Sequence, residues 1–265
     1  MKLFDSHCHL DDRVYDPDMD SVLERARSAG VAAMMIAGIN LKTSQKAVAL
    51  AGAHPEIFAS VGFHPHDASE ADETGMETLI DLTDSPRVLA WGEIGLDFNR
   101  MYSPRPVQEK WLIRQLDAAD ALNLPVIFHE RESDGRLLEI LKQYHQNTGH
   151  GVIHCFSGTR PELLQYLDMG YAIGITGILT IQSRGAKLRE LAADIPPERI
   201  LIETDAPYLT PAPEKNHFRR NEPAFVRSVL LKLAEVRHTD PDELSDILWH
   251  NTCRLFRIPM TIGEK

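Results

Sequence analysis

The chain has 265 residues, a length that fits one α/β barrel or two small domains. Hydrophobic residues make up 43% and charged residues 25%, as in an ordinary globular protein. The net charge of −11 argues against nucleic-acid binding through a broad basic surface, although a site with divalent cations can receive phosphates locally. No apolar stretch approaches the roughly 20 residues that span a bilayer, and the N-terminus leads directly into a strand, so we expect a cytoplasmic protein.

Eight short apolar runs, rich in Val, Ile and Ala, follow one another along the chain and have the length of buried parallel strands. They cover residues 3–4, 32–37, 57–61, 88–91, 125–128, 152–153, 171–175 and 200–202. Helical patterns lie between or after them, at residues 16–30, 105–122, 161–168, 222–236 and 240–256. Strands that alternate with helices predict an α/β fold, a single (β/α)8 TIM barrel of the metal-dependent hydrolase type over residues 1–265. A doubly wound open sheet is the alternative.

Polar residues gather where these runs end, and this favours the barrel, because a barrel brings the C-terminal ends of all its strands onto one face. His7 and His9 are two residues apart on one strand, so both imidazoles face the same way and can bind one metal. A structural, hydrogen-bonded role is the alternative for any single histidine. Six of the 12 histidines lie at strand ends: His7, His9, His64, His66, His129 and His154.

Two carboxylates complete this set. Glu93 ends the fourth run, where it can bridge two metals, and Asp205 follows the eighth run. Glu203 and Asp205 are two residues apart, so we expect both to point into the barrel mouth, where cations or hydrogen-bond donors must offset their like charges. Imidazole and carboxylate ligands suit Zn²⁺, Mn²⁺ or Fe²⁺, and Mg²⁺ suits the carboxylate-rich side. Six ligands are too many for one tetrahedral ion, so the sequence predicts two divalent ions and hydrolytic chemistry.

Five segments taken together resemble the TatD family of metal-dependent deoxyribonucleases. The first segment alone, with its H-x-H pattern, opens many amidohydrolase-like barrels, but the ordered set covers nearly the whole chain. The segments are 5–10 (DSHCHL), 62–66 (GFHPH), 92–97 (GEIGLD), 154–158 (HCFSG) and 203–208 (ETDAPY).

This resemblance implies a TIM barrel that hydrolyses DNA phosphodiesters, often as a 3′→5′ exonuclease on single strands. It implies two metals with Glu93 shared between them, expected to be Mg²⁺ or Mn²⁺ in function, with Zn²⁺ as an alternative. His7, His9 and Asp205 would complete one metal site, and His129 and His154 the other. We expect single-stranded DNA as the substrate, with RNA as an alternative, and a monomer that does not bind membranes.

We expect in-line attack on phosphorus by a metal-activated water that Asp205 orients and deprotonates. Glu203 is expected to assist as an acid or base, or alternatively to orient a ligand histidine. His64 is expected to contact the scissile phosphate or the leaving oxygen, with loop packing beside Pro65 as the alternative.

Further candidates for substrate binding are His66, Arg131, Tyr208, Arg219 and Arg220. Arg131 can hold a phosphate with two hydrogen bonds, or pair with a neighbouring glutamate. The adjacent Arg219 and Arg220 can meet the nucleic-acid backbone, or form a charged face at the start of a helix. Tyr208 can stack on a base, or pack within the protein.

Two other functions use the same kind of site. Small-molecule amidohydrolases and esterases on such barrels often carry a modified lysine at the end of the fourth strand, but no Lys occurs from residue 88 to 99, and Glu93 takes that place. A D-aminoacyl-tRNA deacylase would attack an ester carbonyl with the same metal hydroxide, and it is kept as an alternative.

Overall fold

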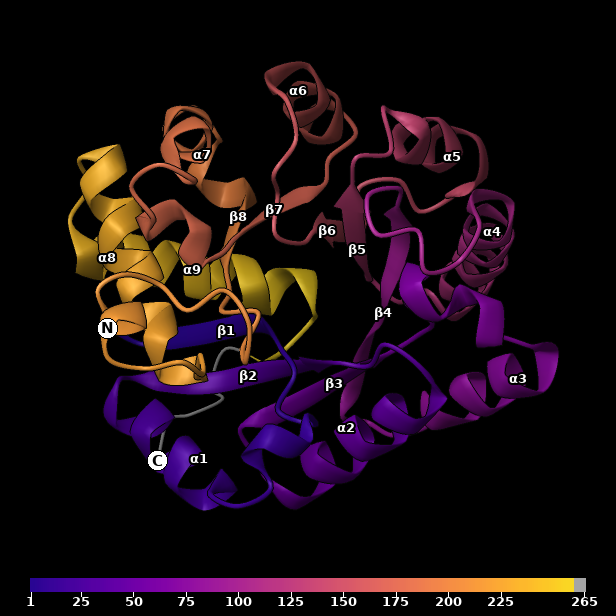
Figure 1. The fold of residues 1–265 in the computed structure, drawn as a ribbon, viewed down its shortest axis with the longest axis horizontal. Coiled ribbons are helices and arrows are strands. Elements are labelled where there is room, and N and C mark those ends of the chain that lie inside the picture. The colour runs from indigo at the N-terminus through magenta and orange to yellow at the C-terminus, as the bar shows by residue number, and fades with distance from the viewer. Residues whose placement is uncertain (260–265) are drawn as a thin grey trace. The chain divides into compact units, whose positions relative to one another are not determined.

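Strands and helices alternate along residues 1–259, the part of the chain that the computed structural model describes (Figure 1). The strands follow one another in chain order: β1 (Leu3–Cys8), β2 (Val31–Ala37), β3 (Ile57–Val61), β4 (Val88–Asp97), β5 (Val126–Arg131), β6 (Gly151–Ile153), β7 (Ala172–Ile175) and β8 (Ile200–Ile202). The α-helices are α1 (Met19–Ser28), α2 (Leu41–Ala53), α3 (Glu73–Leu82), α4 (Arg105–Leu122), α5 (Arg136–Tyr144), α6 (Arg160–Asp168), α7 (Ala186–Ala192), α8 (Val226–Arg237) and α9 (Pro241–Leu255). Short 3-10 helices are η1 (Arg13–Tyr15), η2 (Pro65–Glu70), η3 (Gly177–Thr180), η4 (Pro197–Arg199), η5 (Glu214–Asn216) and η6 (Pro223–Phe225).

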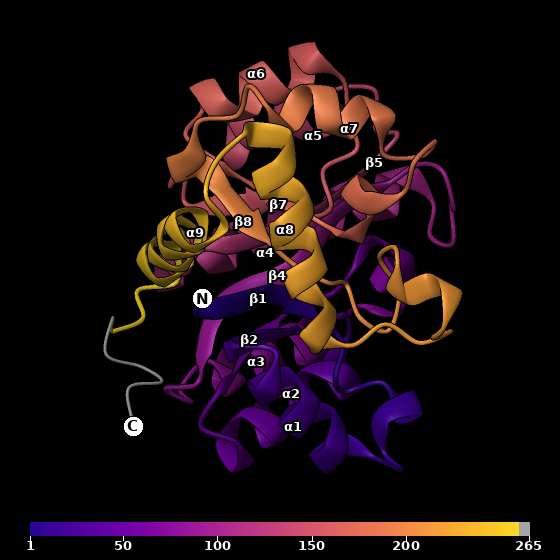
Figure 2. The same ribbon diagram turned by 90° about the vertical axis from the view of Figure 1, so that its left-hand side faces the viewer.

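The chain divides into two compact units, which we call the terminal unit (residues 1–36 and 173 onward) and the central unit (residues 37–172). In the terminal unit, β1 pairs with β2 and β7 pairs with β8, both in parallel. The end of β1 is joined to the loop after β8, because the backbone N–H of Asp205 donates to the carbonyl of His7 at 2.9 Å. Helices α8 and α9 lie beside β1 (Figure 2), where Phe4 packs against Trp249 at 5.9 Å between ring centroids.

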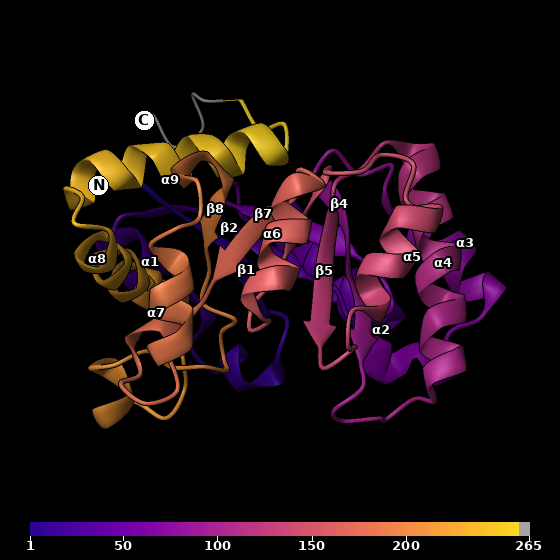
Figure 3. The ribbon, with the colours of Figure 1, turned by 90° about the horizontal axis from the view of Figure 1, so that it is seen from above.

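In the central unit, strands β3, β4, β5 and β6 pair successively in parallel. Helix α4 packs against β4, and α4 and α5 lie side by side (Figure 3). The core between strands and helices is apolar, with Trp91 and Phe128 fully buried. None of the helices within residues 1–259 is long and apolar enough to cross a membrane.

The predicted elements agree closely with the observed ones, and the differences have local causes. The runs at 57–61 and 200–202 and the helix at 105–122 match β3, β8 and α4 residue for residue. Strand β4 continues beyond the predicted end at residue 91, to Asp97, because the chain keeps pairing with β5 as far as Arg131. Gly95 makes this possible, since its φ is +149° and a Cβ there would overlap the carbonyl of His129. The helix predicted from residue 222 begins instead as the 3-10 turn η6.

Two buried glutamines on one face of α4 hold the backbone of the loops that carry the candidate site. Gln115 accepts a hydrogen bond from the backbone N–H of Phe63 at 2.7 Å and donates to the carbonyl of the same residue at 3.0 Å. Gln108 does the same for Asp97, at 2.8 and 3.0 Å. The glutamines are seven residues apart, which is two helical turns, so they face the same way. A glutamine side chain has the donor and acceptor of a peptide group, so each replaces a missing strand partner.

We predict that Gln115→Leu lowers the free energy of unfolding by on the order of 3 kcal/mol, because the N–H and carbonyl of Phe63 and the indole N–H of Trp91 lose their buried partner. Urea unfolding followed by circular dichroism, without added metal, measures this change. Gln143→Leu, at an exposed position of α5, is the matched control and should change stability by no more than about 0.5 kcal/mol. Equal stability of the two variants would show that Gln115 does not hold the loop.

Candidate metal centre

In the terminal unit, two imidazoles and a carboxylate converge at the end of β1. The Nε2 atoms of His7 and His9 are 3.2 Å apart, and Oδ1 of Asp205 lies 3.8 Å from the first and 3.4 Å from the second. Ligands of a tetrahedral ion with bonds of about 2.0–2.1 Å lie roughly 3.3 Å from one another. The three donor atoms therefore have the spacing of three ligands of one metal ion.

The loop that carries Asp205 is fixed from two sides. Asp5 on β1 accepts hydrogen bonds from the backbone N–H of Thr204 at 2.8 Å and from its hydroxyl at 2.6 Å. Burial raises the pKa of Asp5 to about 8, although these hydrogen bonds act in the opposite direction. Asn221, also buried, donates to the carbonyls of Thr204 and Tyr208 at 2.9 and 2.6 Å. These contacts hold Asp205 in a left-handed conformation with φ of +58°.

Glu203 has different surroundings from Asp205. It is fully buried and accepts a hydrogen bond from the Ser6 hydroxyl at 3.3 Å, and its carboxylate lies so close to Gly174 that a Cβ there would collide with it. The expectation that both carboxylates point into the barrel mouth assumed strand alternation, but β8 ends at Ile202. Period-two alternation therefore does not extend to Asp205.

In the central unit, three imidazoles surround one carboxylate oxygen. Oε1 of Glu93 lies 2.8 Å from Nδ1 of His129, 3.5 Å from Nε2 of His64 and 3.9 Å from Nε2 of His154. Glu93 is 3% exposed, so its charge is largely removed from water. The structure thus brings His64, His129 and His154 together around Glu93, in the C-terminal half of β4.

Asp97 is a member of this cluster that the sequence interpretation missed. Its Oδ2 lies 2.7 Å from Nε2 of His66 and 3.3 Å from Nε2 of His129, while Oδ1 accepts the backbone N–H groups of Asn99 and Arg100. Burial raises its pKa, but the hydrogen bonds from the two histidines outweigh burial and hold the pKa of Asp97 well below its usual range. Glu93 and Asp97 are four residues apart on β4, so strand alternation places them on the same face, and this pattern could have predicted Asp97.

The histidines of the central unit differ in charge. Burial lowers the pKa of His129, but its hydrogen bonds with Asp97 and Glu93 outweigh burial and raise the pKa to about 9. Burial lowers the pKa of His64 to about 4, so this imidazole is neutral. In the neutral ring, Nδ1 accepts the backbone N–H of His66 at 3.1 Å, so the proton is on Nε2. His64 is therefore arranged to donate a hydrogen bond to an oxygen rather than to bind a metal through Nε2.

The predicted substrate-binding residues outside the histidine cluster differ in exposure and in their partners. Tyr208 is 55% exposed, with its ring 6.0 Å from that of His9, and Arg219 is exposed on the loop before η6. Arg131 is half-buried at the end of β5. Arg220 instead binds both carboxylate oxygens of Asp18 at 2.7 Å, and it also binds Glu222. These contacts occupy Arg220 within the protein.

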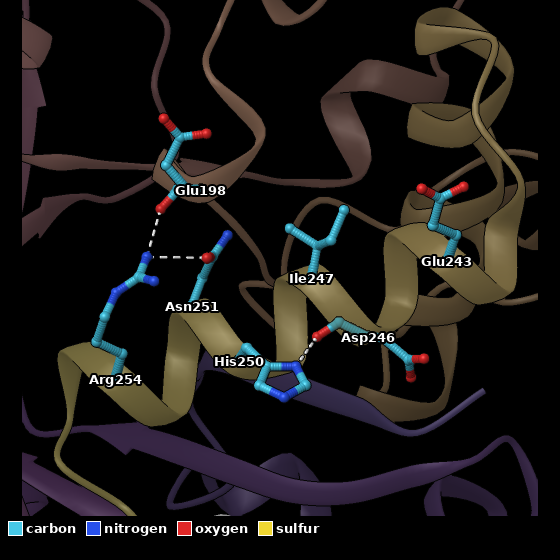
Figure 4. A pocket seen from close by; sticks show the side chains of 7 residues that line it. All are labelled: Glu198, Glu243, Asp246, Ile247, His250, Asn251 and Arg254. Carbon is cyan, nitrogen blue, oxygen red and sulfur yellow. Dashed lines mark hydrogen bonds between the residues drawn. The ribbon is translucent and has the colours of Figure 1, made fainter.

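A hollow of about 390 Å³ is lined by Glu198 of η4 and by side chains of α9 (Figure 4). Arg254 there donates to the carbonyl of Glu198 at 2.7 Å and to Asn251 at 2.9 Å, and His250 bonds to the backbone of Asp246. None of the predicted site residues lines it.

Nitrogen and oxygen donors at ligand spacing fit a divalent metal in both units. In the central unit, Oε1 of Glu93 lies 2.8 Å from Nδ1 of His129 and 3.9 Å from Nε2 of His154, and in the terminal unit the donor atoms of His7, His9 and Asp205 are 3.2 to 3.8 Å apart. Imidazole with carboxylate is the donor set of hydrolytic Zn²⁺ and Mn²⁺ sites, and it admits Mg²⁺ on the carboxylate side.

Comparison with known proteins gives a consistent result. The model of the family of TatD-related DNases matches residues 4–257. The chain is 40% identical over 259 residues to the 3′-5′ ssDNA/RNA exonuclease TatD of Rahnella sp. (strain Y9602), covering 97% of this chain and 98% of that protein. It is 42% identical over 259 residues to the protein of the same name from Erwinia tasmaniensis, covering 97% of this chain and all of that one.

Solved structures show the same fold. A TatD homologue from Escherichia coli K12 superposes with a TM-score of 0.88 at 31% identity, covering 97% of this chain and 98% of that one. A TatD-family hydrolase from Entamoeba histolytica gives a TM-score of 0.87 at 26% identity, covering 98% and 99%. The predicted (β/α)8 barrel and the predicted resemblance are thereby confirmed. The chain belongs to the family of TatD-related DNases.

Proposed function

We propose that this protein is a divalent-metal-dependent 3′→5′ exonuclease that hydrolyses phosphodiesters of single-stranded DNA, and of RNA as well. The observation that carries the proposal is the convergence of His7 and His9 with Asp205 at ligand spacing, alongside the three imidazoles around Glu93. The names of the Rahnella and Erwinia relatives, which share about 40% identity along nearly the whole chain, support the reaction and the substrate.

We propose that the predicted ligands hold two divalent ions, as the resemblance to the TatD family implies. In this proposal His7, His9 and Asp205 hold one ion, His129 and His154 hold the other, and Glu93 is shared. Mg²⁺ or Mn²⁺ is the proposed pair, with Zn²⁺ as the alternative. Bound ions of this kind lower the pKa of a water and offset the charge of a phosphate.

The surroundings of each acid support a different role. Asp205 has a side chain that is 15% exposed and lies beside His7 and His9, so we propose that it orients the attacking water and accepts its proton. Glu203 is fully buried against Ser6, which favours a positioning role over proton transfer with solvent or substrate. His64, with its proton on Nε2, would donate to the phosphate or to the leaving oxygen.

We also infer that the chain is one domain, because the limits of the two units fall inside β2 and β7 rather than in linkers. The last six residues of the predicted domain lie outside the described part of the chain. The monomeric state and the cytoplasmic location stay predictions from the sequence.

Digestion of single-stranded DNA labelled at either end tests the proposed function. With Mg²⁺ or Mn²⁺ we expect stepwise loss from the 3′ end, and EDTA should abolish it. Glu93→Gln, which keeps the shape but removes the charge, should lower kcat/KM by at least about 100-fold. No cleavage under any metal, in a protein that binds metal, would contradict the nuclease and favour an ester or amide substrate.

We predict that Asp97→Asn raises the metal concentration needed for half-maximal activity by about 10–100-fold, because Asp97 orients His66 and His129. Activity measured over a Mn²⁺ titration checks this, and excess metal should restore most of kcat. Asp67→Asn is the matched control, since Asp67 accepts from Asn40 and should leave the metal requirement unchanged. A loss of kcat that excess metal does not restore would rule out the positioning role.

A further inference from the structure

The loop between β4 and α4 presents an exposed aromatic side chain next to His66, in the cluster of histidines around Glu93 and Asp97. Tyr102 is 66% exposed, and its ring centroid lies 4.8 Å from that of His66, with the planes at 76°. A ring that is this exposed buries little apolar surface, so its position contributes little to the stability of the fold. Its contact with His66 puts it beside a side chain that Asp97 holds in the cluster.

The backbone on both sides of Tyr102 is anchored. Ser103 is fully buried, and its hydroxyl donates to the carbonyl of His66 at 2.9 Å and accepts from the N–H of Ser69 at 2.9 Å. Gln108 donates to the carbonyl of Ser103 at 2.8 Å. At the start of the loop, Asp97 accepts the N–H groups of two consecutive residues, 99 and 100. The ring is therefore carried by a backbone that is already ordered, and little conformational entropy is lost when a ligand contacts it.

The chemistry of an exposed ring beside a phosphodiesterase site indicates what it contacts. Aromatic side chains are stacking platforms for the bases of single strands, and every base has a face that can stack. Arg100, two residues earlier, is exposed and gives this loop a positive charge for a backbone phosphate. We propose that Tyr102 forms a stacking subsite for a base of the single-stranded substrate, next to His66. This inference rests on the proposed function and adds to it a binding contact with little sequence preference.

Binding affinity and steady-state kinetics, each measured on a strand with bases and on a strand with abasic residues at its 3′ end, test the subsite. Affinity is measured by fluorescence anisotropy with Mn²⁺ on an oligonucleotide whose 3′ linkages are phosphorothioates that resist hydrolysis, and KM and kcat are measured on the unmodified strand. Each is repeated with a strand that carries abasic residues at its 3′ end. Tyr102→Phe keeps the ring, Tyr102→Ala removes it, and Leu164→Ala, at an exposed apolar side chain of α6, is the matched control.

We expect Tyr102→Ala to raise Kd and KM about 10-fold on the strand with bases and to leave kcat unchanged. Tyr102→Phe and Leu164→Ala should behave as the wild type, and on the abasic strand all variants should bind equally. The proposed subsite would be overturned if Tyr102→Ala lost the same affinity on both strands, or lost none on either. It would also be overturned if Tyr102→Phe bound as weakly as Tyr102→Ala. If the wild type binds the strand with bases more tightly than the abasic strand but cleaves neither, the proposed nuclease activity is contradicted and the proposed stacking subsite is supported. If the wild type binds neither strand, both fail, and Tyr102 is left as a contact for a protein.

Discussion

The burial of carboxylates on strands β1 and β4 is the constraint on which this site depends. Removing a carboxylate from water costs several kcal/mol unless charges or hydrogen bonds offset it. Here Glu93 and Asp97 are offset by histidines, and Asp5 by a threonine hydroxyl and a backbone N–H. His129, whose pKa is raised by hydrogen bonds with Asp97 and Glu93, can exchange its proton for a divalent cation, because a proton and a cation offset the charge of the same acids. The arrangement that keeps the fold stable therefore also provides a set of metal ligands.

A buried polar frame keeps these ligands in place. Gln115 and Gln108 hold the backbone at Phe63 and Asp97, and Asn221 holds the loop that carries Asp205. Each of these amides satisfies backbone groups that have left regular strand pairing. The site is thus built on strand ends and on loop positions that buried amide side chains hold in place, which suits a reaction that needs reacting groups held to within a fraction of an ångström.

The strands and much of the site could be predicted from the sequence, because both depend on local patterns. Apolar runs of strand length end at His7, Glu93 and His129, and a barrel brings such ends to one face. Contacts between distant residues could not be predicted. Arg220 pairs with Asp18, 202 residues away in the sequence, and no local pattern could indicate this ion pair. The surroundings of Glu203 could not be predicted from strand alternation either, because β8 ends at Ile202.

The most direct test of the two-metal centre is the anomalous scattering of Mn²⁺ in crystals of the full-length protein. Two peaks are expected, roughly 3.5–4 Å apart. One peak should contact His7, His9 and Asp205, the other should contact His129 and His154, and Glu93 should contact both. A single peak, or peaks away from these strand ends, would contradict the two-metal centre on which the proposed reaction depends.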